Sequence, residues 1–217
     1  MNRAVQTMPR ADIWAAIHRE RAALADELAD LTPQQWSAPS LCGRWSVQEV
    51  VAHLTAAAST GRLRWIRSMI GARFDADLHN ERRLREQLGA GPADTLERFR
   101  AAVTNTTAPS GHTPAWLGEI VVHGGDIRYP LGLTGAPTLP GVTEVARFFA
   151  ARDFTVAGRT ATAGLHLRAT DGPFDTGTGP SVRGSTLALV MAMAGRAAYC
   201  AELDGPGVAT LRERIGG

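Results

Sequence analysis

The chain has 217 residues, of which 44% are hydrophobic and 20% are charged, and its formal net charge is +2. This length is sufficient to bury a hydrophobic core in one large domain or in two small ones, and the composition is that of an ordinary soluble protein. The net charge is too small to indicate binding to nucleic acid or to a membrane surface.

The sequence also bears on the cellular compartment. The stretch MNRAVQTMPRADIW lacks the apolar segment of a signal peptide, and no apolar run reaches the ~18–20 residues of a membrane span. The two cysteines, Cys42 and Cys200, are far apart and do not form the pattern of a disulfide framework. We therefore expect a cytoplasmic protein with reduced thiols.

The first third of the chain has the pattern of helices. Apolar residues at helical spacing predict an amphipathic helix over 11–31, and the Thr-Pro pair at 32–33 is typical of a short helical restart. The S-x-x-E pattern at 46–49, directly before an apolar run, is that of a capping box. It predicts a helix from about 47 to about 70 with His53 in its second turn.

The middle of the chain continues this pattern. The polar segment 73–88 is expected to form a loop and a short solvated helix, and a further helix is expected over 93–104. A second Thr-Pro start predicts a helix over 113–132, and one more helix is expected over 139–157.

The character of the sequence changes at Gly158. Alternating residues predict a strand within 163–170, and one or two short strands are expected within 174–183. An apolar helix is expected over 186–199, with an interruption at Gly195, and a short helix ends the chain over 205–215. The predicted fold class is therefore mainly α with a small α+β part.

The change at Gly158 also suggests two domains. We expect a helical domain over 1–157 and a small α+β domain over 158–217. No internal repeat is visible.

A candidate metal site follows from three of the predicted helical residues. Glu119 and His123 are four residues apart, and residues at this spacing lie one above the other on a helix face. His53, on another helix, can supply a third ligand. Alone, the Glu-His pair is also compatible with a chance surface pair, and His53 with a buried core histidine.

The ligand types indicate which metal and which role to expect. Two imidazoles and a carboxylate suit zinc, with bonds of roughly 2.0–2.2 Å, and three protein ligands leave an open coordination position. This favours a catalytic over a structural site, because a metal with an open position lowers the pKa of a bound water or thiol. Nickel, iron and manganese accept the same ligands.

Residues next to this set have alternative roles. Gly124 and Gly125 each cost about 1 kcal/mol inside a helix, so close helix packing or a ligand near the backbone is expected there. Asp126 can orient a metal-bound histidine, or it can form a salt bridge with Arg128. Glu49 is better explained as a capping residue than as a ligand.

Three other features of the sequence are weaker candidates for a functional site. Cys42 can be a thiolate ligand or nucleophile, but it lies in a loop without an activating pattern. The Gly-Thr-Gly at 177–179 resembles part of a phosphate loop, but a hairpin turn explains it better because no helix follows at the required spacing. Arg196 interrupts an apolar helix, so its charge must reach solvent, a structural partner or an anionic substrate.

The motifs LTPQQW, SLCGRWSVQEVVAHL and WLGEIVVHGGDIRYPLG, in this order, resemble the mycothiol-dependent maleylpyruvate isomerase family of DinB-like metalloenzymes. The later segment LHLRATDGPFDTGTGPSVRGSTLALVMAMAGRAAY is similar to the small C-terminal domain of that family. The resemblance implies a DinB-like up-and-down four-helix bundle that binds a divalent metal, followed by a sterol-carrier-like domain. It further implies that His53, Glu119 and His123 are the metal ligands and that Arg196 binds the carboxylate of the substrate.

The same resemblance implies a function. The metal, zinc in the first instance, would hold mycothiol as a thiolate for addition to an electrophilic small molecule, as in cis-trans isomerisation of a maleylpyruvate-like substrate or in S-transfer. The sequence leaves open which reaction applies, which substrate is used, and whether the chain is a monomer or a homodimer. Two alternative functions are a non-catalytic bundle that binds metal or a small molecule and a metal-dependent hydrolase that needs no thiol.

Overall fold

The computed structural model describes residues 8–43 and 45–216. The chain divides into two compact units: a helical unit, residues 14–136, and an α+β unit, residues 137–216 with residues 8–13. The expected boundary after residue 157 differs from this division, because the helix over 139–151 packs against a helix of the α+β unit. No helix in the described part of the chain has the length and apolar character needed to cross a bilayer.

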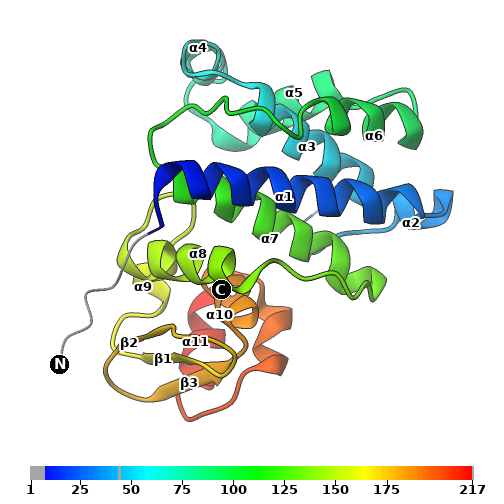
Figure 1. The fold of residues 1–217 in the computed structure, drawn as a ribbon. Helices are drawn as coiled ribbons and strands as arrows, with labels where there is room; N and C mark the ends of the chain where they lie inside the picture. Colours follow the sequence, from blue (N-terminus) through cyan, green and yellow to red (C-terminus); the bar gives the residue numbers. More distant parts are fainter. Residues whose placement is uncertain (1–7, 44, 217) are drawn as a thin grey trace. The chain divides into compact units, whose positions relative to one another are not determined.

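The helical unit is built around a central helix, α3, which packs against α2, α5, α6 and α7 (Figure 1). Its elements are α1 (Arg10–Ala29), α2 (Pro33–Ser37), α3 (Val47–Ser59), α4 (Arg62–Gly71), α5 (Ala76–Gln87), α6 (Pro92–Ala101) and α7 (Thr113–Leu131). The largest fully buried side chains of this unit come from separate helices, among them Ile17, Leu24, Leu28, Leu84, Phe99, Leu117 and Ile127. These long helices confirm the predicted mainly α fold class.

The predicted helix from 47 to 70 is in fact two helices. α3 ends at Ser59, and Thr60 and Gly61 take extended backbone conformations before α4 begins. Threonine and glycine both have low helix propensity, so the chain turns there even though the apolar pattern continues. The prediction of one continuous helix was therefore wrong.

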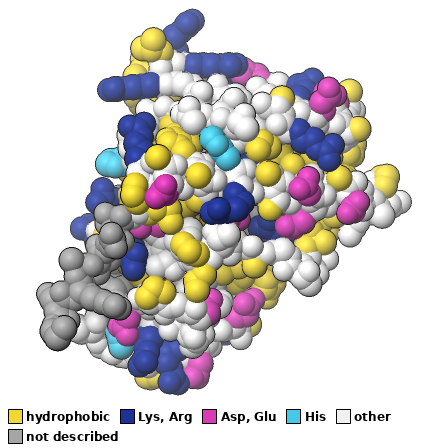
Figure 2. All heavy atoms as spheres, in the orientation of Figure 1, with side chains coloured by type: hydrophobic (Ala, Val, Ile, Leu, Met, Phe, Trp, Pro, Cys, Tyr) yellow, Lys and Arg dark blue, Asp and Glu magenta, His cyan; other side chains and the backbone are white. Residues whose placement is uncertain are grey.

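α4 contributes little to the core of the helical unit. None of its residues is buried, and Leu63 and Ile70 are 78% and 58% exposed. Figure 2 shows hydrophobic and basic side chains next to one another at the end of the unit where Figure 1 places α4. α4 is connected to α5 by the His79 ring, whose Nδ1 lies 2.8 Å from the hydroxyl of Ser68.

The predicted capping box fixes the start of α3. The Ser46 hydroxyl accepts from the backbone N–H of Glu49, and the backbone N–H of Ser46 donates to Glu49 Oε2 at 2.8 Å. This confirms the expectation that Glu49 is a capping residue. Since α3 carries His53, the cap also sets where that side chain lies along the helix.

Removing this cap is expected to destabilise the protein slightly. In a Ser46→Ala variant the Glu49 N–H loses its acceptor, which costs about 1 kcal/mol. Urea unfolding monitored by circular dichroism should show a lower midpoint with an unchanged slope. A Ser37→Ala variant, whose hydroxyl bonds only to carbonyls of its own helix, is the control and should unfold as the wild type does.

The α+β unit contains the predicted small sheet. Its elements are α8 (Leu139–Ala151), α9 (Gly158–Ala161), β1 (His166–Ala169), β2 (Asp175–Gly177), β3 (Ser181–Gly184), α10 (Thr186–Met193), a 3-10 helix η1 (Ala197–Glu202) and α11 (Val208–Ile215). The strand order is β2-β1-β3, with β1 antiparallel to β2 and parallel to β3. The apolar helix α10 packs against both α8 and the sheet.

The Gly-Thr-Gly segment connects β2 to β3, which lie on opposite sides of β1. It is therefore not the hairpin turn expected from the sequence, which would join neighbouring strands. Gly177 and Gly179 have φ of 80° and 121°, and a Cβ on either would lie 2.2 Å from a carbonyl oxygen. These glycines are explained by the tight connection and need no phosphate ligand.

Candidate metal centre

The structure brings the three predicted ligands together inside the helical unit. His53 lies on α3, and Glu119 and His123 lie on α7. His53 Nε2 is 2.7 Å from Glu119 Oε1, and His123 Nε2 is 3.7 Å from the same oxygen. One ligand atom from each residue lies within 4.8 Å of the other two.

Helix geometry accounts for this convergence. Glu119 and His123 are one turn apart on α7 and share a face, and α3 packs against α7 so that His53 comes from the opposite side. The two imidazole rings meet edge to face, with centroids 4.8 Å apart and planes at 76°. Two ring nitrogens and a carboxylate oxygen therefore surround one point between the helices.

The spacing of these atoms fits a small divalent metal. Bonds of about 2.0–2.1 Å in a tetrahedral zinc site place neighbouring ligand atoms about 3.3 Å apart. The observed separations of 2.7 and 3.7 Å lie on either side of this value. A hydrogen bond holds His53 and Glu119 next to each other. Small shifts of the two side chains would let a shared cation take the place of this hydrogen bond.

The cluster is largely buried, but it is open on the side of Glu119. The His53 and His123 side chains are 10% and 11% exposed, whereas that of Glu119 is 20% exposed. A shallow recess with room for about one water molecule borders Glu119 and is lined also by Arg21, Leu54, Ala57, Thr107, Trp116 and Ile120. Glu119 is therefore the most solvent-accessible residue of the cluster.

Arg21 gives this recess a buried positive charge. Its Nη1 donates to the carbonyl of Asn105 at 2.9 Å, and the residue is 5% exposed. Burial lowers the pKa of Arg21 to about 10, although the charge of Glu119 acts in the opposite direction. The guanidinium remains a cation at neutral pH and partly balances the Glu119 carboxylate.

The hydrogen bond of His123 to Asp126 determines which ring nitrogen is available. His123 Nδ1 lies 2.9 Å from Asp126 Oδ2, and Asp126 is fully buried. An ionised carboxylate can only accept, so Nδ1 carries the proton. In the neutral ring, the lone pair is then on Nε2, which is the nitrogen nearer to Glu119.

The pKa of His123 is strongly shifted. Burial is the largest influence and lowers it, but the hydrogen bonds to Asp126 and Cys42 and the charges of Glu119 and Asp126 raise it to about 10. Without a metal, His123 is therefore an imidazolium at neutral pH. A metal that binds Nε2 must displace a proton.

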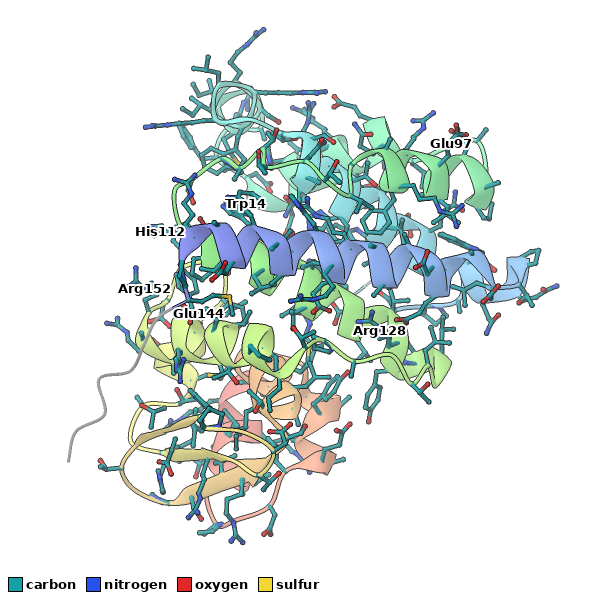
Figure 3. All side chains as sticks on the ribbon, in the orientation of Figure 1. Trp14, Glu97, His112, Arg128, Glu144 and Arg152 are labelled. Atoms are coloured by element: carbon teal, nitrogen blue, oxygen red, sulfur yellow. The ribbon has the colours of Figure 1, made fainter. Side chains whose placement is uncertain are left out.

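The salt bridge predicted as one alternative for Asp126 and Arg128 is not formed. Arg128, which is labelled in Figure 3, pairs instead with Glu27 on α1. Its Nε and Nη2 donate to the two carboxylate oxygens of Glu27 at 2.8 and 2.9 Å. Asp126 Oδ2 accepts from His123 Nδ1. Gly124 makes room for this arrangement, since a Cβ there would lie 2.8 Å from Arg128 Nη1.

Two further residues contact the cluster: Cys42, which the sequence offered only as a weak candidate ligand or nucleophile, and Trp45, which it did not single out. Cys42 hydrogen-bonds to His123, and its sulfur belongs to a compact group with His123 and Asp126. The ring of Trp45 lies 4.8 Å from the ring of His53, centroid to centroid. Both belong to the loop before α3, and only the closeness of SLCGRW to the capping box hinted at this position.

Arg196, the predicted carboxylate anchor, belongs to the α+β unit. It follows α10, is half-buried, and its Nη1 donates to the carbonyl of Ala194 at 2.6 Å. Its role toward a substrate therefore stays a prediction.

Part of the helical unit matches a known protein family. Residues 17–116 match the family described as the mycothiol maleylpyruvate isomerase N-terminal domain. Residues 17–116 belong to that family. The resemblance to the mycothiol maleylpyruvate isomerase family is thus confirmed over residues 17–116, a segment that includes His53.

Solved structures show that the likeness of fold extends beyond this segment. A histidine-to-alanine mutant of the mycothiol-dependent maleylpyruvate isomerase matches with a TM-score of 0.64 and 13% identity, over 93% of this chain and 96% of that one. A second structure of that isomerase matches with a TM-score of 0.61 and 14% identity, over 88% and 92%. A search of curated proteins gave no significant match.

Proposed function

We propose that this protein is a metal-dependent enzyme that activates a low-molecular-weight thiol, mycothiol, for addition to an electrophilic small molecule. The reaction is cis-trans isomerisation of a maleylpyruvate-like substrate or S-transfer. The observation that carries the proposal is the convergence of His53, Glu119 and His123, with separations of 2.7 and 3.7 Å, where Glu119 borders a shallow recess.

Each residue of the cluster has a defined task in this proposal. His53, Glu119 and His123 hold the divalent metal, with zinc as the expected ion. When bound there, such a metal lowers the pKa of a coordinated thiol and stabilises the thiolate. Asp126 accepts a hydrogen bond from Nδ1–H of His123, which leaves Nε2 to bind the metal.

Two arginines are proposed to stabilise negative charge. Arg21 lines the recess beside Glu119 and stabilises negative charge there. Arg196 is proposed to bind the carboxylate of the substrate, as the family resemblance implies. The cytoplasm is the proposed compartment, because that is where a small thiol stays reduced.

The decisive experiment measures metal content and thiol binding together. Elemental analysis of the purified protein is expected to give one divalent metal per chain. Mycothiol at about 100 times its Kd should then stabilise the metal-loaded protein by about 2.7 kcal/mol, which corresponds to roughly 5–10 °C in Tm. Methylated mycothiol, which cannot form a thiolate, is the matched control and should give a much smaller shift.

The outcome also separates the alternatives. A metal-loaded protein that does not respond to thiols would overturn the proposed activity and favour a non-catalytic bundle. Turnover of an ester or amide without any thiol would instead indicate a hydrolase that uses metal-bound water.

A further inference from the structure

The described residues of the loop before α3, 39–43 and 45–46, are held against the candidate metal centre by hydrogen bonds. The Ser40 hydroxyl accepts from the backbone N–H of Cys42 at 3.0 Å and donates to the carbonyl of Trp45 at 2.7 Å. Pro39 and Ser46 pair as an isolated antiparallel bridge where the loop closes. These bonds fix the two ends of the loop to each other and give it a defined shape.

One further bond ties this loop to α7 beside the ligands. The backbone N–H of Leu41 donates to the carbonyl of Asp126 at 3.0 Å. Asp126 is the residue whose carboxylate accepts from His123 Nδ1. The loop is therefore anchored at the residue that orients one metal ligand, and it places Cys42 next to that ligand.

Each imidazole of the cluster contacts one residue of the loop. Trp45 packs against His53, with ring centroids 4.8 Å apart. Cys42 hydrogen-bonds to His123. The same loop therefore restrains both histidines, which come from different helices.

The position of the Cys42 sulfur distinguishes support from ligation. Among the described residues, two groups can offer ligand atoms within 4.8 Å of one another: Cys42 with His123 and Asp126, and His53 with Glu119 and His123. The groups share only His123. The sulfur thus lies with the Asp126 carboxylate, outside the group formed by the three proposed ligands.

We propose that Cys42 is a positioning residue of the metal centre, which acts with Asp126 to hold the His123 imidazole with Nε2 turned toward Glu119 and His53. This inference rests on the proposed function and adds to it a side chain that no pattern in the sequence assigned. Partners that hydrogen-bond to a metal-bound histidine fix the ring orientation, and their loss commonly weakens metal affinity by about 10–100-fold.

Zinc affinity of the full-length protein, measured by competition with a chromophoric chelator at one fixed pH, tests this role. Cys42→Ala is expected to weaken zinc binding about 10-fold or more. Cys42→Ser keeps a small hydrogen-bonding group and should stay within about threefold of the wild type. Cys200→Ala, which removes the buried cysteine of the α+β unit, is the matched control and should bind zinc as the wild type does.

Absorption of the cobalt(II)-substituted protein supplies a second readout. A thiolate ligand gives an intense sulfur-to-cobalt charge-transfer band in the near ultraviolet, and the wild type without added thiol should lack it. The presence of that band, abolished in Cys42→Ala, would mean that Cys42 is a ligand and would overturn the positioning role.

The failure of this inference can be told apart from failure of the proposed function. Wild-type protein that binds no zinc would overturn both. Wild-type protein that binds zinc, together with equal affinity in Cys42→Ala or equally weak affinity in Cys42→Ser and Cys42→Ala, would overturn only the role of the Cys42 hydrogen bond.

Discussion

The His53→Ala and His123→Ala variants are each expected to be isolated with almost no bound metal and to lose activity with the thiol and substrate. Each substitution removes one of three protein ligands. Because the loss of a partner that merely supports a ligand costs about 10–100-fold in affinity, the loss of the ligand itself should weaken metal binding by more than about 100-fold. Activity should fall at least in proportion to the metal lost.

Metal stoichiometry and chelator competition are the primary measurements for this prediction. His166→Ala is the matched control, since it removes an imidazole from β1 in the α+β unit and should retain one metal per chain. Circular dichroism in the presence of a chelator checks that the variants fold, because His53 and His123 are buried. Full metal content in either variant would show that the metal binds elsewhere.

The position of this site was accessible from the sequence because it depends on helix periodicity. The spacing of Glu119 and His123 on one helix, and the capping box that starts the helix of His53, are local features of the chain. Helix geometry converts such spacings into faces without any tertiary information. Only the packing of α3 against α7 had to be supplied by the resemblance to a known family.

The features that were missed depend on tertiary contacts. The loop that carries Cys42 takes its position from a bond between Leu41 and Asp126, residues far apart in the sequence. α3 and α4 are separate helices because Thr60 and Gly61, which have low helix propensity, take extended conformations although the apolar pattern continues past them. Similarly, the assignment of α8 to the α+β unit follows from its packing on α10, which no local pattern predicts.

Metal affinity is expected to fall steeply as the pH is lowered. The pKa of His123 is about 10 in the metal-free protein, so the ring is protonated throughout the range from pH 8 to pH 6. Each metal ion that binds Nε2 then releases this proton, and the apparent affinity drops about tenfold per pH unit. Zinc titrations against a chelator should show a loss of about 100-fold between pH 8 and pH 6.

An Asp126→Asn variant separates this effect from general loss of the site. The asparagine oxygen can still accept from Nδ1, but the negative charge that raises the pKa of His123 is removed. A smaller fraction of the rings is then protonated near pH 8, so the dependence of zinc affinity on pH between 8 and 7 should become flatter. An unchanged slope would show that His123 is not the group that exchanges a proton for the metal.

The metal-free protein should show the opposite pH trend in stability. The folded-state pKa of His123 lies above the unfolded value of about 6.5, so the protonated ring contributes stability that is fully present below pH 6.5 and is lost as the pH rises toward 10. Urea unfolding of the metal-free wild type should therefore give a free energy of unfolding that decreases from pH 7 to pH 10, and Asp126→Asn should reduce this decrease. One proton on one imidazole would then account for both trends: it stabilises the metal-free fold and competes with the metal for the same nitrogen.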